Sequence, residues 1–158
     1  MDLNHNYIAA DLGCGSGVFT IPLSKKVKRV YAIDVEPKMI EIVDQKIIKN
    51  KIINIATMLS LDNKIPLAND FLDLLLTINT LHEFNDLNRT LSEIYRILKP
   101  NGKVAVVDFK KKNEGLGPPQ NIRISSHKAR KLFIEKKFEV LKMKYFRFDY
   151  FLLLKKYI

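Results

Sequence analysis

The segment from Ala10 to Gly17 constrains this chain most, because three glycines at alternate positions separate an apolar run from a helical pattern. The apolar run Tyr7–Ala10 predicts a buried parallel strand, and the helical pattern begins at Val18. Glycine lets the backbone turn sharply and approach a ligand closely, and a helix start leaves backbone N–H groups free to bind it. The order strand, glycine turn, helix therefore predicts a loop that binds a nucleoside-type cofactor.

The spacing of the glycines indicates which cofactor this is. A dinucleotide fingerprint reads Gly-x-Gly-x-x-Gly or Ala, because a small sixth residue lets the pyrophosphate and the helix pack closely. In this chain the glycines are Gly13, Gly15 and Gly17, and the sixth position is Val18. The pattern therefore argues against a nicotinamide oxidoreductase.

With Asp11 before the loop and Asp34 at the end of the next apolar run, the segment resembles motif I of the class I S-adenosylmethionine-dependent methyltransferases, specifically the type 11 group. The resemblance spans nearly the whole chain. It implies a Rossmann-like, doubly wound α/β fold with helices on both faces. The sheet is expected to be mostly parallel, with strand order 3-2-1-4-5-7-6 and an antiparallel C-terminal hairpin strand. Residues 1–158 are expected to form one methyltransferase domain.

Composition fits one globular domain, since the chain has 158 residues and 47% of them are hydrophobic. It contains no apolar run of membrane-spanning length and no signal-peptide pattern, so we expect a cytoplasmic protein that does not bind membranes. The one cysteine, Cys14, excludes an internal disulfide and a cysteine-based metal cluster, and we expect no metal. Cys14 is interpreted as a small packing residue of the loop, with a reactive thiol as the alternative.

Charge is distributed unevenly along the chain. Residues 1–100 contain 12 Lys and Arg against 12 Asp and Glu, whereas residues 101–158 contain 15 against 5, so the net charge of +10 lies in the last third. This excess indicates either a surface for an anionic partner such as nucleic acid or an ordinary solvated face. The lysines lack the interleaved exposed aromatic residues typical of nucleic-acid modules, which favours the solvated face.

Asp34 ends the second apolar run, Arg29–Asp34, 21 residues after Gly13. At this separation a carboxylate at the end of the second strand can accept from both ribose hydroxyls. The alternative is that Asp34 caps the next helix, which the pattern predicts from Glu36 to about Lys49. Two neighbours are assigned to the same cofactor site, Val35 and Met39; Met39 would touch the adenine ring unless it is only part of the core.

The third predicted strand, Ile52–Met58, is followed by a segment that the resemblance assigns to the adenine site. In the family an acid here accepts from the adenine amine, ahead of a Leu-Pro-Phe sequence. Ile65-Pro66-Leu67 matches that sequence, but the expected acid falls on Leu61, and Asp62 comes one position later. Leu61 and Asp62 are therefore both assigned to the cofactor site.

The apolar run Phe71–Ile78 predicts a central parallel strand, and the residues after it face the same crevice as the glycine loop. Asn79 is assigned to the cofactor site. His82 is the candidate catalytic base, beside Glu83, with hydrogen bonding to the backbone as the alternative. The Pro-Pro-aromatic sequence of adenine- and glutamine-methylating enzymes is absent here, and a single cysteine does not suit an arsenite methyltransferase.

The rest of the chain alternates helices and strands. We expect a helix ending near Leu98, a turn at 98–102, a strand over Lys103–Phe109 and a helix from Ser125–Ser126 to about Lys136. Two final strands, Phe138–Tyr145 and Tyr150–Lys155, predict the antiparallel hairpin. The segment Lys110–Pro119 is either a mobile loop beside the ligand or a connector.

The resemblance implies methyl transfer from S-adenosylmethionine to an unidentified acceptor, most simply a small molecule. The reaction is an in-line displacement that depends on alignment, which is compatible with the lack of a catalytic triad. Family members usually carry a helical cap before motif I, but here six residues precede Tyr7, so we expect an open cleft that a second copy, a partner chain or the substrate closes. The alternatives are a methyltransferase acting on RNA or another anionic macromolecule and a non-catalytic cofactor-binding partner subunit.

Overall fold

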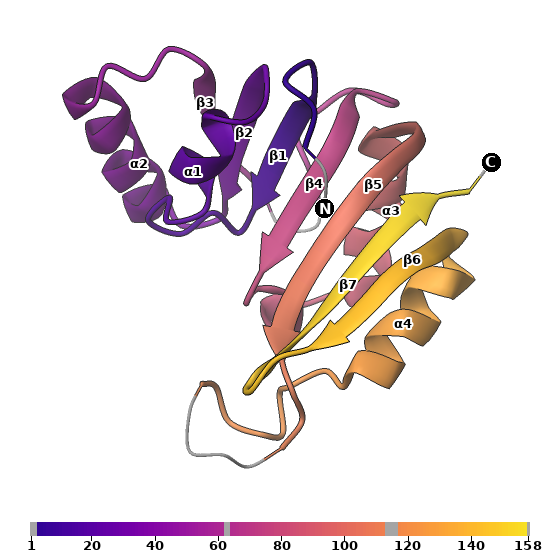
Figure 1. Cartoon of the computed structure of the whole chain (residues 1–158). Coiled ribbons are helices and arrows are strands. Elements are labelled where there is room, and N and C mark those ends of the chain that lie inside the picture. Colours follow the sequence, from indigo (N-terminus) through magenta and orange to yellow (C-terminus); the bar gives the residue numbers. More distant parts are fainter. Residues whose placement is uncertain (1–2, 62–63, 113–116, 158) are drawn as a thin grey trace.

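The computed structural model describes residues 3–61, 64–112 and 117–157. In this part of the chain seven strands form one sheet in the order β3-β2-β1-β4-β5-β7-β6 (Figure 1). Neighbouring strands from β3 to β5 are parallel, while β7 is antiparallel to both β5 and β6. The predicted strand order, the mostly parallel sheet and the antiparallel hairpin are confirmed.

The elements follow one another along the chain as predicted: strands and helices alternate up to the C-terminal hairpin, except that β4 follows β3 with no helix among the described residues between them. Their bounds are β1 (Ile8–Leu12), α1 (Thr20–Ser24), β2 (Arg29–Asp34), α2 (Pro37–Lys49), β3 (Ile55–Leu59), β4 (Leu72–Ile78), a 3₁₀ turn η1 (Leu81–Glu83), α3 (Leu87–Ile97), β5 (Leu98–Phe109), α4 (Ser126–Glu135), β6 (Phe138–Tyr145) and β7 (Asp149–Lys156).

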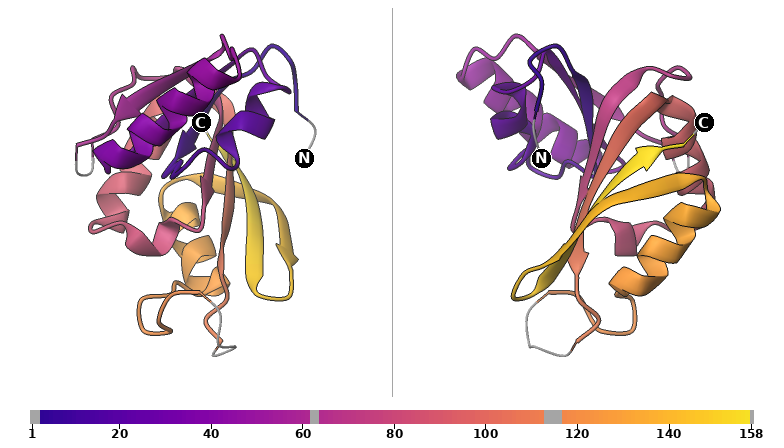
Figure 2. Two further views of the ribbon diagram at one scale, coloured as in Figure 1. Left: turned by 90° about the vertical axis from the view of Figure 1, so that its left-hand side faces the viewer. Right: turned by 45° about the vertical axis from the view of Figure 1, so that its right-hand side comes forward.

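Each face of the sheet has its own apolar core. One core packs α1 and α2 on the first strands through residues such as Leu23, Val43 and Ala32. The other packs α3 and α4 on the central and last strands through residues such as Ile94 and Phe133. Helices on both faces, visible in the two views of Figure 2, complete the predicted doubly wound architecture.

Helix starts follow local capping chemistry. The side chain of Glu36 accepts from Lys38 N ahead of α2, and Pro37 occupies the first turn, where a proline needs no donor. Ser125 accepts from Lys128 N and begins α4. These starts lie where the sequence predicts them.

Several boundaries differ from the prediction by two or more residues, among them the start of α1, at Thr20 rather than Val18, and the end of β1, at Leu12 rather than Ala10. Helix α1 ends at Ser24 rather than near Lys26. Strand β3 begins at Ile55 rather than Ile52, because the side-chain amide of Asn54 binds Ser24 O and Val27 O and holds the preceding residues in a turn. Strand β5 begins at Leu98, since Leu98 pairs with Leu72 across a register shift and the predicted turn at 98–102 is taken up into the strand.

The predicted loop over Lys110–Pro119 is held at both ends by one buried side chain. The guanidinium of Arg123 donates to Lys110 O at 3.1 Å, to Lys112 O at 2.7 Å and to Pro118 O at 2.7 Å. Only 7% of Arg123 is exposed. The described ends of this segment are therefore fixed to the domain.

No helix within the described residues combines the length and the apolar character needed to span a bilayer.

Candidate functional site

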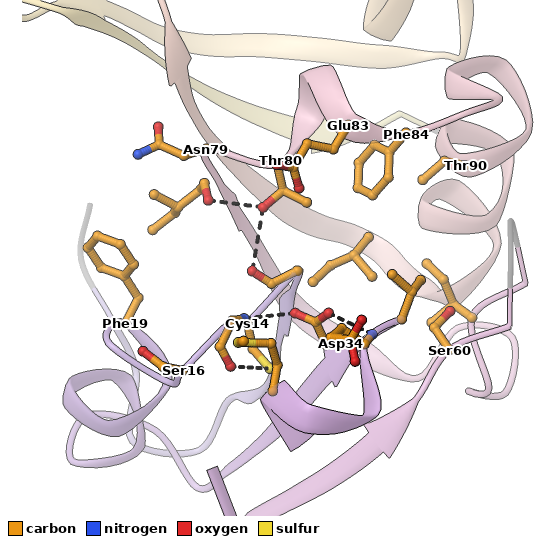
Figure 3. A pocket seen from close by; sticks show the side chains of 18 of the residues that line it. Cys14, Ser16, Phe19, Asp34, Ser60, Asn79, Thr80, Glu83, Phe84 and Thr90 are labelled. Carbon is orange, nitrogen blue, oxygen red and sulfur yellow. Dashed lines mark hydrogen bonds between the residues drawn. The ribbon is translucent and has the colours of Figure 1, made fainter. Parts of the chain in front are cut away.

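A cavity of about 800 Å³ lies at the carboxyl ends of β1, β2 and β4. Figure 3 shows it between the glycine loop and Asp34 on one side and the residues that follow β4 on the other. Its size suits a ligand of nucleoside or drug-like dimensions. The lining comprises Leu12–Ser16, Val18, Phe19, Asp34–Glu36, Met39, Ser60, Leu61, Lys64, Ile65, Ile78–Thr80, Glu83–Asn85 and Thr90.

Gly13 and Gly15 have different reasons to be glycine. Both have positive φ, +75° and +50°. A Cβ on Gly13 would lie 2.5 Å from Thr80 Oγ1 and 2.8 Å from Thr80 Cβ, so close packing between β1 and β4 excludes a side chain there. A Cβ on Gly15 would meet no atom within 4 Å. Glycine at position 13 therefore allows the ends of β1 and β4 to pack closely. Glycine at position 15 leaves open space at the cavity, where a ligand can approach the backbone.

Asp34 links the second strand to the glycine loop. Its Oδ2 accepts from Gly15 N at 2.8 Å and its Oδ1 accepts from Glu36 N at 3.0 Å. A carboxylate offers about four lone-pair sites, so roughly one on each oxygen stays available to a ligand. Asp34 lines the cavity, and the cap of α2 is Glu36, not Asp34. The carboxylate is therefore placed to accept from two neighbouring ligand hydroxyls.

Asp11 lies beneath the loop and not among the lining residues. It is 2% exposed and accepts from Thr20 Oγ1 at 2.6 Å. Burial raises the pKa of Asp11 to about 6; the nearby Asp34 charge adds to this rise, while the Thr20 hydrogen bond opposes it. Asp11 thus ties the end of β1 to α1 and fixes the loop from below.

Cys14 lines the cavity but is 7% exposed and packs in the core. Burial, together with the charges of Asp11 and Asp34, raises the pKa of the Cys14 thiol to about 12. The thiolate is the nucleophilic form, so this side chain is inert near neutral pH. The packing interpretation of Cys14 fits these observations, whereas a reactive thiol does not.

Three of the residues assigned to the adenine side line an apolar wall. Val35 and Leu61 are 66% and 75% exposed, and Met39 is half-buried beside them. Exposed apolar side chains facing a cavity are suited to a flat, apolar ring. Asp62, the acid assigned to the adenine amine, lies outside the described residues.

A half-buried ion pair on α3 holds the loop that closes this wall. Glu93 accepts from Ile65 N at 3.1 Å and from Arg96 at 2.7 Å. Arg96 in turn donates to Leu67 O at 2.8 Å and to Ile65 O at 3.0 Å. The hydrogen bonds to Arg96 lower the pKa of Glu93. The pair therefore fixes a cavity-lining loop from a helix that the sequence did not connect with the site.

The wall of the cavity opposite the glycine loop comes from the residues after β4 (Figure 3). Asn79 is exposed and has a φ of +55° at the end of the strand, with its N–H donating to Val107 O at 2.8 Å. Glu83 and Phe84 follow on and after η1, on the same side of the cavity in Figure 3. Of the residues assigned to the cofactor, the structure brings these to one cavity: Gly13, Cys14, Gly15, Asp34, Val35, Met39, Leu61 and Asn79.

Sequence reasoning missed several lining residues, notably Phe19, Ser60, Thr80 and Phe84. Thr80 could have been found, because it directly follows Asn79 at a strand end. Phe19, which is 47% exposed, was read as part of the helical pattern after the loop. Its position at the cavity depends on how short α1 is, and no residue pattern signals that.

His82 forms a buried pair with a residue of β5. Its Nδ1 lies 2.7 Å from Asp108 Oδ1, and the two side chains are 3% and 1% exposed. Asp108 also accepts from the backbone N–H groups of His82 and Phe109. Desolvation raises the pKa of Asp108, while the nearby His82 opposes that rise. The His82 ring does not line the cavity, but its Nε2 lies 3.9 Å from Oε1 of Glu83, which does.

Residues 10–106, well over half of the chain, match the family model described as a methyltransferase domain. The chain belongs to this family, as a type 11 methyltransferase domain of class I. Its fold overlays that of an S-adenosylmethionine-dependent methyltransferase from Aquifex aeolicus with a TM-score of 0.91 and 27% identity, covering 98% of this chain and 84% of that one.

Two curated relatives align with nearly two thirds of this chain. A demethylmenaquinone methyltransferase from Lactobacillus johnsonii is 33% identical over 104 residues, 63% of this chain and 43% of that protein. An uncharacterized methyltransferase-like protein from Schizosaccharomyces pombe is 32% identical over 106 residues, 66% of this chain and 39% of that protein. The chain thus spans about two fifths of the length of these relatives.

The residues of the cavity fit the cofactor that the family uses. The glycine loop leaves open space at Gly15, Asp34 has acceptor capacity for ribose hydroxyls, and an apolar wall at Val35 and Met39 suits adenine. Within residues 3–61, 64–112 and 117–157, no group of three or more His, Cys, Asp or Glu side chains is arranged to hold a metal ion.

Proposed function

We propose that this chain transfers a methyl group from S-adenosylmethionine to an acceptor that enters the cavity beside Phe19, Asn79 and Glu83. The observation that carries the proposal is the carboxylate of Asp34, held by Gly15 N at 2.8 Å in the wall of an 800 Å³ cavity. When bound, S-adenosylmethionine supplies an electrophilic methyl group on a positively charged sulfur. The site residues named in the sequence analysis, including Asp11 and Asp62, are proposed to hold or support it.

The side chains of the site are proposed to divide the work. Asp34 accepts from the ribose hydroxyls, Val35 and Met39 pack on the adenine ring, and the backbone at Gly13 and Gly15 lets the methionine end come close. Asn79 borders the place where the acceptor atom must stand. In-line displacement gains mainly from alignment, so a rigid cavity wall is the main catalytic contribution of the protein.

His82 is proposed as the group that takes the proton of the acceptor. Asp108 accepts from two backbone N–H groups and its Oδ1 lies 2.7 Å from His82 Nδ1, so we assign the proton of the neutral imidazole to Nδ1. Nε2 then carries the lone pair, 3.9 Å from Glu83 Oε1. Glu83 lines the cavity and is proposed to connect it with the buried imidazole.

The acceptor is proposed to be a small organic molecule, as for the demethylmenaquinone methyltransferase that is similar to this chain. An open cavity with a largely apolar lining suits such a molecule. A cytoplasmic location, and a second copy or partner closing the cleft, remain part of the proposal.

Isothermal titration with S-adenosylmethionine, S-adenosylhomocysteine and NADH tests the cofactor. We expect the first two ligands to bind and NADH not to bind. Release of S-adenosylhomocysteine in the presence of pooled small molecules or RNA then tests turnover. Binding without turnover on every pool would favour a non-catalytic partner subunit, and tight NADH binding would contradict the proposal.

A further inference from the structure

The hairpin of β6 and β7 places lysines and phenylalanines from separate strands on one face. Lys142 pairs with Leu153 and Lys144 pairs with Phe151, and directly opposed residues of an antiparallel pair point to the same side. Phe146 follows at the end of β6 and is 53% exposed. Together they line a shallow hollow of about 260 Å³, formed by Lys142, Lys144, Phe146 and Phe151 and called here the hairpin hollow.

The hairpin hollow lies on the face of β6 and β7 that points away from α4. Helix α4 packs on the opposite face, where Phe133 contacts Phe138 edge to face at 5.3 Å and Ser126 Oγ lies 3.2 Å from Tyr145 Oη. The helices on the side of the hollow, α1 and α2, make their main contacts with β2 and β3 (Figure 2). Within the described residues, the hollow therefore stays open to a partner.

Positive charge dominates this surface. In the described part of the chain, neither Lys142 nor Lys144 forms an ion pair, while Glu139 on the same strand is already paired with Lys155 at 3.0 Å. Asp149, at the start of β7, keeps its Oδ1 buried. Because Glu139 is paired with Lys155, the hollow keeps the charge of its two lysines.

More cations adjoin the hollow at the turn of the hairpin. The guanidinium of Arg147 lies 4.9 Å from the ring centroid of Phe148, and Phe148 O accepts from Lys110 N at 2.8 Å. This contact sets the run Lys110–Lys112 beside the turn. In Figure 1 the turn lies at the same edge of the sheet as the carboxyl ends of β1 and β4, which border the cavity.

We propose that the hairpin hollow, with Arg147 and Lys110–Lys112, binds single-stranded nucleic acid. Ammonium groups neutralise backbone phosphates, and the exposed ring of Phe146 can stack on an unpaired base, which a duplex does not offer. The half-buried Phe151 forms the apolar floor of the hollow. An acidic protein surface would bind the lysines but would leave the Phe146 ring without a stacking partner.

The test is the fluorescence anisotropy of a labelled single strand of about 12 nucleotides, as RNA and as DNA, titrated with the whole chain over a range of salt. We expect Lys142→Glu with Lys144→Glu to weaken binding at least about tenfold and to reduce the salt slope by about two. The control, Lys25→Glu with Lys49→Glu, makes the same charge change at exposed positions near α1 and α2. It should weaken binding of the labelled strand much less.

Phe146→Ala tests the stacking contribution without burying or exposing a core residue. We expect it to weaken single-strand binding about tenfold and to leave duplex binding unchanged. Equal effects of the two lysine pairs, equal loss for duplex and single strand, or binding only to vesicles of phosphatidylglycerol would each overturn the proposal. The RNA and DNA arms decide which nucleic acid is preferred.

Cofactor titration of the same samples separates the two proposals. If S-adenosylmethionine binds while no nucleic acid does, the hairpin hollow is not a nucleic-acid surface and the proposed function stands. If nucleic acid binds while the cofactor does not, the hairpin hollow is a nucleic-acid surface and the proposed function is wrong. The lysine variants should retain cofactor affinity, because neither residue lines the cavity.

Discussion

Asp34 Oδ2 and Gly15 N are joined by a 2.8 Å hydrogen bond across the ends of two neighbouring parallel strands. The carboxylate therefore shapes the glycine loop and faces the cavity at once. Hydrogen bonds to charged groups contribute about 1.5–3 kcal/mol each. Changes at Asp34 should consequently lower ligand affinity and also loosen the glycine loop that this carboxylate holds.

Asp34→Ala should weaken S-adenosylmethionine binding about a hundredfold, because it removes two acceptor oxygens from the cavity wall. Asp34→Asn keeps one acceptor and should lose less. Isothermal titration measures both. Asp44→Ala is the matched control, since Asp44 accepts from Thr57 Oγ1 outside the cavity and its loss should leave affinity unchanged. Equal affinity for Asp34→Ala and the wild type would refute the assigned role.

Gly13→Ala should lower the free energy of unfolding more than Gly15→Ala does. Both impose a positive φ on alanine, at about 1–2 kcal/mol. At Gly13 the new Cβ also meets Thr80 at 2.5–2.8 Å, so we expect an additional loss of about 1–3 kcal/mol. Urea unfolding of the two variants measures the difference. Similar midpoints would show that the strand ends separate easily.

Asp11 should make the protein less stable as pH rises. Its folded pKa of about 6 exceeds the ordinary 3.8, so the folded state binds more protons than the unfolded state in between. The stabilisation that protonated Asp11 gives the folded state is fully present below about pH 4 and is lost by about pH 6. It amounts to at most about 3 kcal/mol in the free energy of unfolding. The stability difference between wild type and Asp11→Asn, from urea unfolding at pH 4 and pH 7, should shrink or reverse accordingly. A constant difference would mean that Asp11 does not titrate in this range.

His82→Ala should lower kcat about 10²–10⁴-fold at unchanged cofactor affinity if the imidazole takes the proton. Asp108→Asn should reduce kcat and shift its pH profile, because it removes the carboxylate partner of His82 Nδ1. It should also destabilise the protein, because it weakens the hydrogen bonds that the backbone N–H groups of His82 and Phe109 donate to Asp108. Unfolding and single-turnover rates are measured on the same samples. A His82→Ala variant that loses only stability would assign the pair a structural role.

The sequence by itself determined the order of the elements, the strand order implied by the family resemblance and the two strand ends that form the site. Alternating apolar patterns and glycines act locally, so Gly13, Gly15 and Asp34 could be assigned from spacing. Boundaries at α1, β3 and β5 were missed because Asn54 and Leu98 act through partners elsewhere in the chain.

Only the tertiary structure decided which side chains meet. It placed Asp11 beneath the loop and behind the cavity wall, and joined His82 to Asp108 over 26 residues of separation. It also placed Phe151 of β7 opposite Lys144 of β6, so that the two side chains border the same hollow. Such contacts depend on register and on the packing of distant segments, which residue patterns along one segment do not encode.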